Sequence, residues 1–300
     1  MSMRITTGML QRSILADLNR STERLSHTQG KLSSGKELTR PSDDPAAVGK
    51  ALLLRENVAG SQQHQRNVRD ARGWTEATEA ALSSMTDVVH RAKALVVQGA
   101  SDSSSPAARA SIAKEIDQLI GSLKEQANTS YGGRYLFSGT ATKTPPYGTA
   151  TDAYQGNPDL IAREIGPGVS LAVNTTADQV LGSGQGAGDD KLLDTLADIR
   201  DHLLAGDTAS LQGTDMTRLD AAVDTLLDLR AANGAVGNRL ESAEARLAAV
   251  EELAAKSLSD TEDADMAKTL IDLSTQTSAY QAALKAGANI VQSSLMDFLR

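Results

Sequence analysis

The last part of the chain carries an apolar stripe that no neighbouring segment can cover. Apolar and small residues recur there at alternating steps of four and three, which is the heptad spacing of a helix that packs along other helices. The stripe consists of Met266, Leu270, Leu273, Thr277, Tyr280, Leu284, Gly287, Val291, Ser294 and Phe298. Residues 259–262 have the form of a capping box and predict the start of this helix. The helix therefore needs a partner from elsewhere.

The N-terminal end of the chain offers that partner, because residues 5–34 predict a helix whose leucines also repeat at seven. Residues 1–40 hold seven Lys or Arg against three Asp or Glu, whereas residues 260–300 hold three against six. Opposite charge and a shared period favour antiparallel pairing; the alternative is two separately solvated amphipathic helices. The predicted assembly interface consists of Leu18, Leu25, Leu32, Leu270, Leu273, Tyr280, Leu284, Val291, Leu295 and Phe298.

Between the two ends the sequence predicts more long helices. Asp44 followed by proline is a helix-start signal, and a helix is expected over 46–99. A second proline start, at Pro106, begins a helix that ends near Ser130, and helices resume at Lys191. Aromatic residues are only 3% of the chain, which suits long, thin helical packing better than a thick globular core.

Residues 131–189 differ in composition from the helices. Five of the eight aromatic residues fall within 131–154, among glycines and prolines. The segment 160–165 and the alternating apolar residues at 169–173 predict a β-hairpin. The glycines of 182–188 predict a flexible linker.

The predicted fold class is mainly α with a small β-rich insert, arranged as a nested hairpin of long helices in which both termini form one coiled-coil module. The predicted domains are 1–44 with 260–300, 45–130 with 190–259, and the insert 131–189.

Composition excludes several classes of function. The net charge of −8 argues against a general nucleic-acid binder, and the absence of cysteine excludes disulfides and thiolate metal sites. No apolar run is long enough to span a bilayer, and the N-terminus lacks the apolar core of a secretory signal. We expect a soluble chain without a cleaved signal peptide.

Each motif that suggests an enzyme lacks a residue or a spacing that the activity requires. The segment 30–36 fits a phosphate-binding loop, but Glu37 stands where such a loop needs Ser or Thr, so a helix end is favoured over a nucleotide hydrolase. An acidic pair follows the glycines of 182–188 and would repel a pyrophosphate. The histidines His27, His64, His90 and His202 lack metal-ligand spacing and are expected on solvated helix faces. No catalytic, cofactor or metal site is expected.

Both ends of the chain resemble the bacterial flagellin family. The segment 32–46 resembles its N-terminal signature, a helix ending in Leu-Ser-Ser-Gly before an Asp-Asp-Pro restart. The segment 263–265, the stripe 270–284 and the closing 294–299 resemble its C-terminal region. The segment 133–139, with 144–147 after it, resembles the entry to the outer domain in the branch of the family that forms the hook–filament junction.

This resemblance implies a structural protein of the bacterial flagellum, without enzymatic activity or cofactor. It implies self-association in a ring layer between hook-associated protein 1 and the flagellin filament. It also implies export of the unfolded chain through the flagellar type III apparatus to the cell exterior, with a chaperone on the C-terminal helix beforehand. No nucleic-acid partner and no membrane insertion are expected. The alternatives are flagellin itself and a secreted coiled-coil effector.

Overall fold

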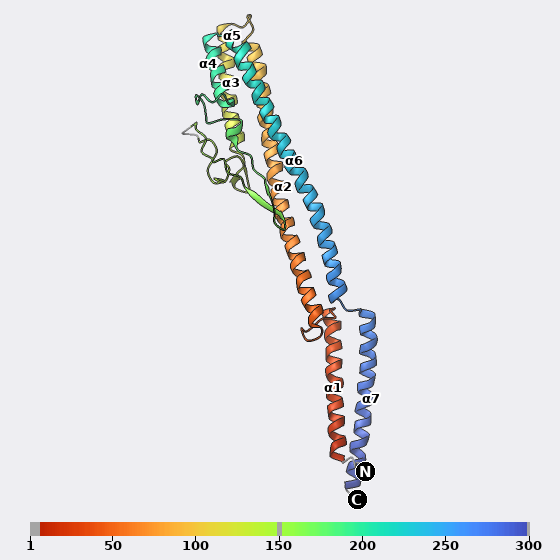
Figure 1. The fold of residues 1–300 in the computed structure, drawn as a ribbon. Helices are drawn as coiled ribbons and strands as arrows, with labels where there is room; N and C mark the ends of the chain where they lie inside the picture. Colours follow the sequence, from red (N-terminus) through yellow and green to blue (C-terminus); the bar gives the residue numbers. More distant parts are fainter. Residues whose placement is uncertain (1–6, 149–151, 299–300) are drawn as a thin grey trace. The chain divides into compact units, whose positions relative to one another are not determined.

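A computed structural model describes residues 7–148 and 152–298, without the side chains of residues 7, 8, 10, 11 and 289–298. Helices dominate it, and two small antiparallel sheets interrupt them (Figure 1). The elements in chain order are α1 (Thr7–Ser34), α2 (Pro45–Gly99), α3 (Pro106–Ala127), β1 (Ser130–Tyr131), β2 (Arg134–Tyr135), β3 (Ala162–Gly166), β4 (Val169–Ala172), the 3-10 turn η1 (Ala177–Gln179), α4 (Leu192–Ala205), α5 (Thr208–Ser210), the π-turn η2 (Leu211–Asp215), α6 (Met216–Glu262) and α7 (Met266–Phe298).

Local chemistry sets most helix boundaries. The Asp44 carboxylate accepts from the amides of Ala46 and Ala47, both at 3.0 Å, so the predicted start of α2 is confirmed. The capping box predicted at 259–262 is wrong, because α6 runs through these residues. The cap of α7 is Asp265 instead, whose Oδ1 accepts from the amides of residues 267 and 268 at 3.0 and 3.1 Å.

The chain divides into two compact units. One contains residues 1–60 and 250–300, and the other contains residues 61–249. The first holds α1, α7, the linkers beside them and the adjoining turns of α2 and α6. The second holds the rest of α2 and α6, α3, α4 and all four strands. The predicted three-part division stays a prediction.

The 61–249 unit has one continuous hydrophobic core. Helices α2, α3, α4 and α6 contribute to it through residues such as Leu82, Ile116, Leu196 and Leu226, each at most 2% exposed. The insert contributes to the same core through Leu136, Phe137, Tyr147, Ile165, Leu171, Val173, Val180 and Leu181. The insert's strands therefore help to complete the helical core.

The predicted hairpin is present, and polar contacts attach it to α2. Strand β3 pairs antiparallel with β4, Arg163 opposite Leu171, as the alternation of residues 169–173 predicts. Asn67 of α2 donates through Nδ2 to the Glu164 carbonyl at 3.0 Å. Asp70 of α2 forms an ion pair with Arg163, with Oδ2 and Nη2 3.0 Å apart.

The glycine-rich segment 182–188 is a hydrogen-bonded loop, so the prediction of a flexible linker is wrong. Asp189 accepts from the amides of Ser183 and Lys191 at 2.7 and 3.0 Å, and the Tyr147 hydroxyl donates to the Gly182 carbonyl at 2.5 Å. Gly182 has φ +79°, and a Cβ there would lie 2.5 Å from the Asp189 carboxylate. The glycine is required by backbone conformation and by space.

Three of the four histidines are half-buried, so the expectation of solvated faces is wrong for them. His202 contacts the fully buried Asp215 of the π-turn through Nδ1 at 2.7 Å, and burial raises the pKa of that carboxyl. His27 contacts Asp43 through Nε2 at 3.3 Å. His90 is exposed as expected.

Because the core is shared, truncating the insert's buried ring should destabilise the helices. We expect Phe137→Ala to lower the free energy of unfolding of the 61–249 unit by about 3–5 kcal/mol. Urea unfolding followed by fluorescence of Trp74, the chain's one tryptophan and 2% exposed, measures this. Leu160→Ala, at a side chain 62% exposed in the same insert, is the matched control. Equal midpoints for both variants would contradict a shared core.

Candidate assembly surface of the terminal helices

Helices α1 and α7 pack side by side and antiparallel (Figure 1). Ile14 lies near Gly287, where a Cβ would come within 3.1 Å of Ile14 Cγ2, and the Thr28 hydroxyl donates to Gln276 Oε1 at 2.9 Å. Two heptad rows meet in the seam, and their members are half-buried or buried. The rows are Ile14, Leu18, Ser21, Leu25, Thr28 and Leu32 of α1, and Thr269, Leu273, Gln276, Tyr280, Ala283 and Gly287 of α7.

Part of the predicted interface lies in this seam. Leu18, Leu25, Leu32, Leu273 and Tyr280 are half-buried there. The α1 row therefore sits where its heptad spacing places it.

Leu270, Thr277 and Leu284 of the predicted α7 stripe lie beside the seam. The row that faces α1 passes through Thr269, Gln276 and Ala283, one position before Leu270, Thr277 and Leu284. Leu270 is 52% exposed and Leu284 is 43% exposed. At 100° per residue these side chains lie roughly 60–100° around the helix from the centre of the seam. The predicted Val291, Leu295 and Phe298 fall outside the described side chains.

The α1–α7 pair has two chemically different sides. Leu15 of α1, which is 61% exposed, follows the seam residue Ile14 as Leu270 follows Thr269, so in an antiparallel pair both flank the seam on the same side. Met266, at 45% exposed, adds to this apolar side.

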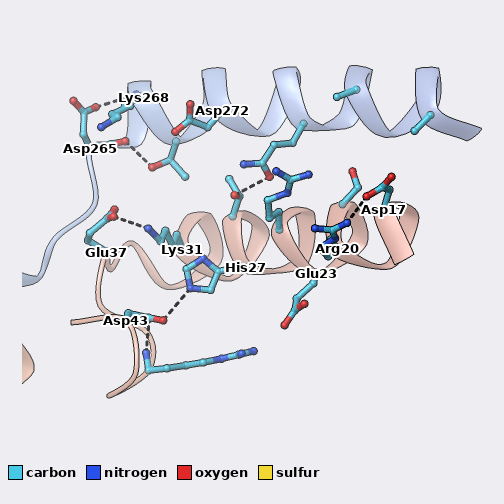
Figure 2. A pocket seen from close by; sticks show the side chains of 18 of the residues that line it. Asp17, Arg20, Glu23, His27, Lys31, Glu37, Asp43, Asp265, Lys268 and Asp272 are labelled. Carbon is cyan, nitrogen blue, oxygen red and sulfur yellow. Dashed lines mark hydrogen bonds and ion pairs between the residues drawn. The ribbon is translucent and has the colours of Figure 1, made fainter. Parts of the chain in front are cut away.

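The other side is a charged groove of about 1070 Å³ (Figure 2). Arg20, Arg24, His27 and Lys31 of α1 line one side of it, and Lys268, Asp272 and Gln276 of α7, with the cap residue Asp265, line the other. Several charges are paired locally: Arg20 with Asp17 at 2.5 Å, and Lys31 with Glu37 at 2.5 Å. These two ion pairs neutralise part of the charge of the groove.

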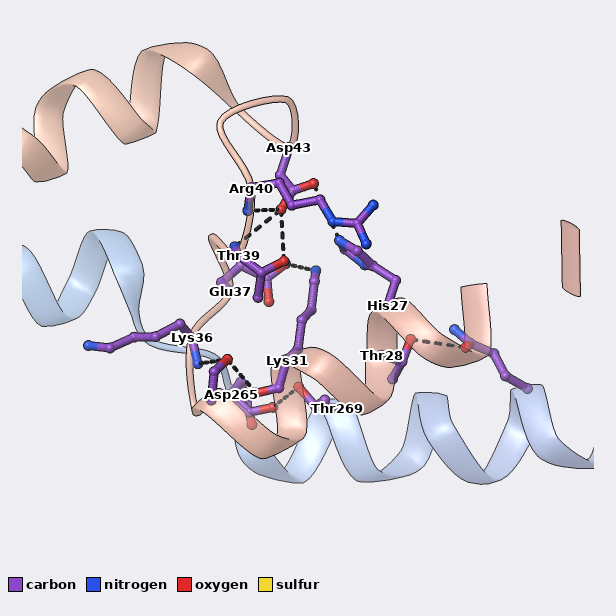
Figure 3. Close-up of polar contacts among 12 residues, drawn as sticks. His27, Thr28, Lys31, Lys36, Glu37, Thr39, Arg40, Asp43, Asp265 and Thr269 are labelled. Atoms are coloured by element: carbon purple, nitrogen blue, oxygen red, sulfur yellow. Dashed lines mark hydrogen bonds and ion pairs between the residues drawn. The ribbon is translucent and has the colours of Figure 1, made fainter. Parts of the chain in front are cut away.

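The linker between α1 and α2 folds around Asp43 (Figure 3). Asp43 Oδ2 accepts from the amides of Thr39 and Arg40 at 3.1 and 2.8 Å, and its Oδ1 contacts His27. These hydrogen bonds, with that from the Arg40 amide foremost, hold the pKa of the Asp43 carboxyl below its usual range. Asp43 therefore fixes the linker against α1.

The two linkers also pair with each other. The Glu37 amide donates to the Glu262 carbonyl at 2.7 Å and the Ala264 amide to the Gly35 carbonyl at 3.0 Å, forming an antiparallel bridge between residues 36 and 263. Gly35 can turn out of α1 here because it adopts φ +68°.

A buried carboxylate lies at this bridge. The Glu262 side chain is 4% exposed and contacts Lys36 Nζ at 2.9 Å and Arg55 Nη2 at 2.7 Å. The hydrogen bond from Arg55, and then that from Lys36, lower the pKa of Glu262. Lys36 also contacts Asp263 at 2.6 Å, and this pair raises the pKa of Lys36.

The described residues contain no group of three or more His, Cys, Asp or Glu side chains placed to hold a metal ion. In the same part of the chain, no helix has the length and apolarity needed to cross a membrane. The apolar side chains of Leu15, Met266, Leu270 and Leu284 are exposed beside the seam. Sequence reasoning missed Gln276 because it is polar, although the heptad offset from Thr269 could have revealed it, and it assigned Glu262 to a capping box.

These features define a class: a helical assembly protein whose two chain ends pair with each other and leave an apolar side uncovered. The profile of the bacterial flagellin N-terminal helical region matches residues 5–142, and that of the bacterial flagellin C-terminal helical region matches residues 216–299. Together the two regions cover about three quarters of the chain. The chain belongs to the bacterial flagellin family.

Relatives of two kinds resemble the chain. Flagellar hook-associated protein 3 of Salmonella typhimurium is 28% identical over 182 residues, which are 60% of this chain and 57% of that protein. The chain thus aligns with little more than half the length of this relative. Flagellin of Bacillus subtilis is 28% identical over 312 aligned residues, which cover 99% of this chain and 100% of that protein.

Solved structures share the fold. A putative flagellar hook-associated protein from Vibrio parahaemolyticus superposes with a TM-score of 0.67 at 21% identity, covering 74% of this chain and 100% of that one. Bacillus cereus FlgL gives a TM-score of 0.58 at 21% identity, covering 69% and 99%. The predicted fold class, mainly α with flagellin-like terminal helices, is confirmed.

The burial pattern predicts which leucines hold the pair together. Leu273→Ala should weaken pairing by about 1–2 kcal/mol, less than a full core truncation because Leu273 is half-buried. Hydrogen exchange of the α1 amides measures the loss. Ile271→Ala, on the opposite face of α7 and at a side chain 67% exposed, is the matched control. Equal exchange in both variants would mean that the seam is misplaced.

The carboxyl of Glu262 should titrate below the usual range of glutamate. Because its pKa is lowered in the folded state, its contribution to stability is present above the unfolded pKa and is lost as the pH falls through the folded value. NMR titration of the side-chain carboxyl carbon measures this. Arg55→Gln should raise the titration midpoint of Glu262. Arg66→Gln is the control: the Arg66 side chain donates to Gln63, so its loss should leave that midpoint unchanged. An unshifted midpoint in Arg55→Gln would contradict the assignment.

Proposed function

We propose that this protein is a structural subunit of the bacterial flagellum that forms the junction layer between the hook and the flagellin filament. In this proposal, subunits associate in a ring through their terminal helices. Hook-associated protein 1 lies on one side of the layer, and flagellin lies on the other. The chain leaves the cell unfolded through the flagellar type III apparatus, and a chaperone covers the C-terminal helix before export.

The observation that carries this proposal is the uncovered apolar side of the α1–α7 pair. Leu15, Leu270 and Leu284 lie beside the seam and are 43–61% exposed. Burial of apolar area is favourable by roughly 25 cal/mol per Å², so a neighbouring helix that covers this row gains free energy that the single chain cannot. A subunit built in this way associates through its ends.

The segment 133–139 favours the junction over the filament. It resembles the junction branch of the family, and here it forms part of the core: Leu136, Phe137 and Ser138 are at most 1% exposed. Gly139 has φ +64°, and a Cβ there would lie 2.0 Å from the Asn157 carbonyl oxygen. The backbone at this point is therefore built around a glycine. Flagellin is the second candidate, supported by the full-length similarity to Bacillus subtilis flagellin.

Deleting the gene in its own host separates the two candidates. Loss of the junction layer should leave hooks without filaments and flagellin in the medium, visible by electron microscopy and by blotting. Complementation with this chain should restore filaments. If the deletion instead leaves intact filaments, or if this chain itself makes up the filament, the junction assignment is wrong.

The apolar row should matter for assembly and little for the monomer. We expect Leu284→Asp to leave the helicity of the purified monomer nearly unchanged, because Leu284 lies outside the seam. Assembly should fail, because the substitution places an unpaired charge where a neighbouring helix packs. Circular dichroism of the monomer and filament counts on complemented cells measure the two effects.

Ser278→Asp is the matched control, since it adds the same charge at an exposed position on the opposite face of α7. It should assemble normally. A large loss of helicity in Leu284→Asp would show that the row stabilises the monomer and is not an interface.

A further inference from the structure

The cluster around Glu262 brings together three segments that are distant in sequence. Lys36 lies in the linker after α1, Arg55 lies in the third turn of α2, and Glu262 is the last residue of α6. Oε1 of Glu262 forms an ion pair with Lys36. Oε2 accepts from Nε of Arg55 at 3.0 Å and contacts Nη2 of Arg55 at 2.7 Å. One buried carboxylate thus binds two cations from different segments.

The position of this carboxylate is important because both pairs of consecutive helices, α1–α2 and α6–α7, are interrupted by a linker here. Residues 35–44 separate α1 from α2, and residues 263–265 separate α6 from α7. The backbone bridge between residues 36 and 263 joins the two linkers to each other. That bridge alone would let both linkers move together with the terminal helices. The Arg55–Glu262 pair adds the contact that ties the bridged linkers to α2.

We propose that Glu262 is a positioning residue: its carboxylate, held between Lys36 and Arg55, fixes the direction of the α1–α7 pair relative to the first turns of α2 and the last turns of α6, all within the unit of residues 1–60 and 250–300. The proposal deepens the proposed function, because a ring of subunits forms only when every terminal pair has the same direction. The carboxylate suits this role chemically. A charge that is 4% exposed is costly to leave unpaired, so both cations stay bound to it.

The neighbouring carboxylate Asp263 has a different role. It contacts Lys36 and accepts from the Ser259 hydroxyl at 2.5 Å, and no described contact joins it to α2. Its side chain is 43% exposed, so water can replace Lys36 there. Asp263 is therefore the matched control for Glu262.

Distance measurements between two spin labels test the proposal on the full-length monomer. The chain has no cysteine, so Ser26→Cys on α1 and Lys50→Cys on α2, both at exposed positions, can be labelled without further changes. The parent and Asp263→Asn should each give one narrow distance distribution. Glu262→Gln and Arg55→Gln should each broaden or split it. Arg55→Lys should restore part of the narrow distribution.

Circular dichroism checks that each variant is folded. If a single variant is not folded, the double variant Arg55→Glu with Glu262→Arg, which exchanges the two charges, tests the same contact. A narrow, unshifted distribution in Glu262→Gln would overturn the proposal, as would equal broadening by Asp263→Asn. These outcomes do not depend on the flagellar role. Filament counts on complemented cells form the final arm: a broadened Glu262→Gln that still builds normal filaments would show that the fixed direction is not used in assembly.

Discussion

Among the described residues, α1 is the helix that packs along α7, and one partner helix limits how much of the apolar surface of α7 is buried. The two helices meet through small and polar residues as well as leucines: Ser21 and Thr28 on one side, Gln276, Ala283 and Gly287 on the other. Small residues let the backbones approach, but they bury little apolar area. The seam is held by its leucines together with close contact at these small residues and the Thr28–Gln276 hydrogen bond. Leu15, Leu270 and Leu284 stay beside it.

Local chemistry made much of the fold predictable. Asp44 and Pro106 start helices because a carboxylate cap and a ring-fixed φ act within one turn. The β3–β4 hairpin followed from the alternation at residues 169–173, but its register, which shifts between Glu164 and Gly166, did not. The surface of α7 that faces α1 could be predicted only in part. One row of the predicted stripe, with Leu273 and Tyr280, does face α1. The second row that faces α1 passes through Thr, Gln and Ala one position before the predicted leucines, because the partner helix decides which neighbouring row is covered.

Contacts between distant segments explain the remaining errors. Ser259 to Glu262 has the sequence of a capping box, and a local reading assigns the Glu262 carboxylate to a nearby amide. In the folded chain that carboxylate binds Arg55, 207 residues away. The loop at 182–188 is similar, because glycine content alone does not show that Asp189 closes it with two hydrogen bonds.

The polar seam also explains why α7 does not turn to bury its leucines against α1. A rotation that brought Leu270 and Leu284 into the seam would carry Gln276 away from Thr28. Thr28 is 7% exposed, and a buried hydroxyl without its partner costs about 1–3 kcal/mol. The Thr28–Gln276 hydrogen bond thus acts as a buried polar residue does in a coiled coil, where it fixes register at a cost in stability. It keeps Leu270 and Leu284 outside the seam, at 52% and 43% exposed.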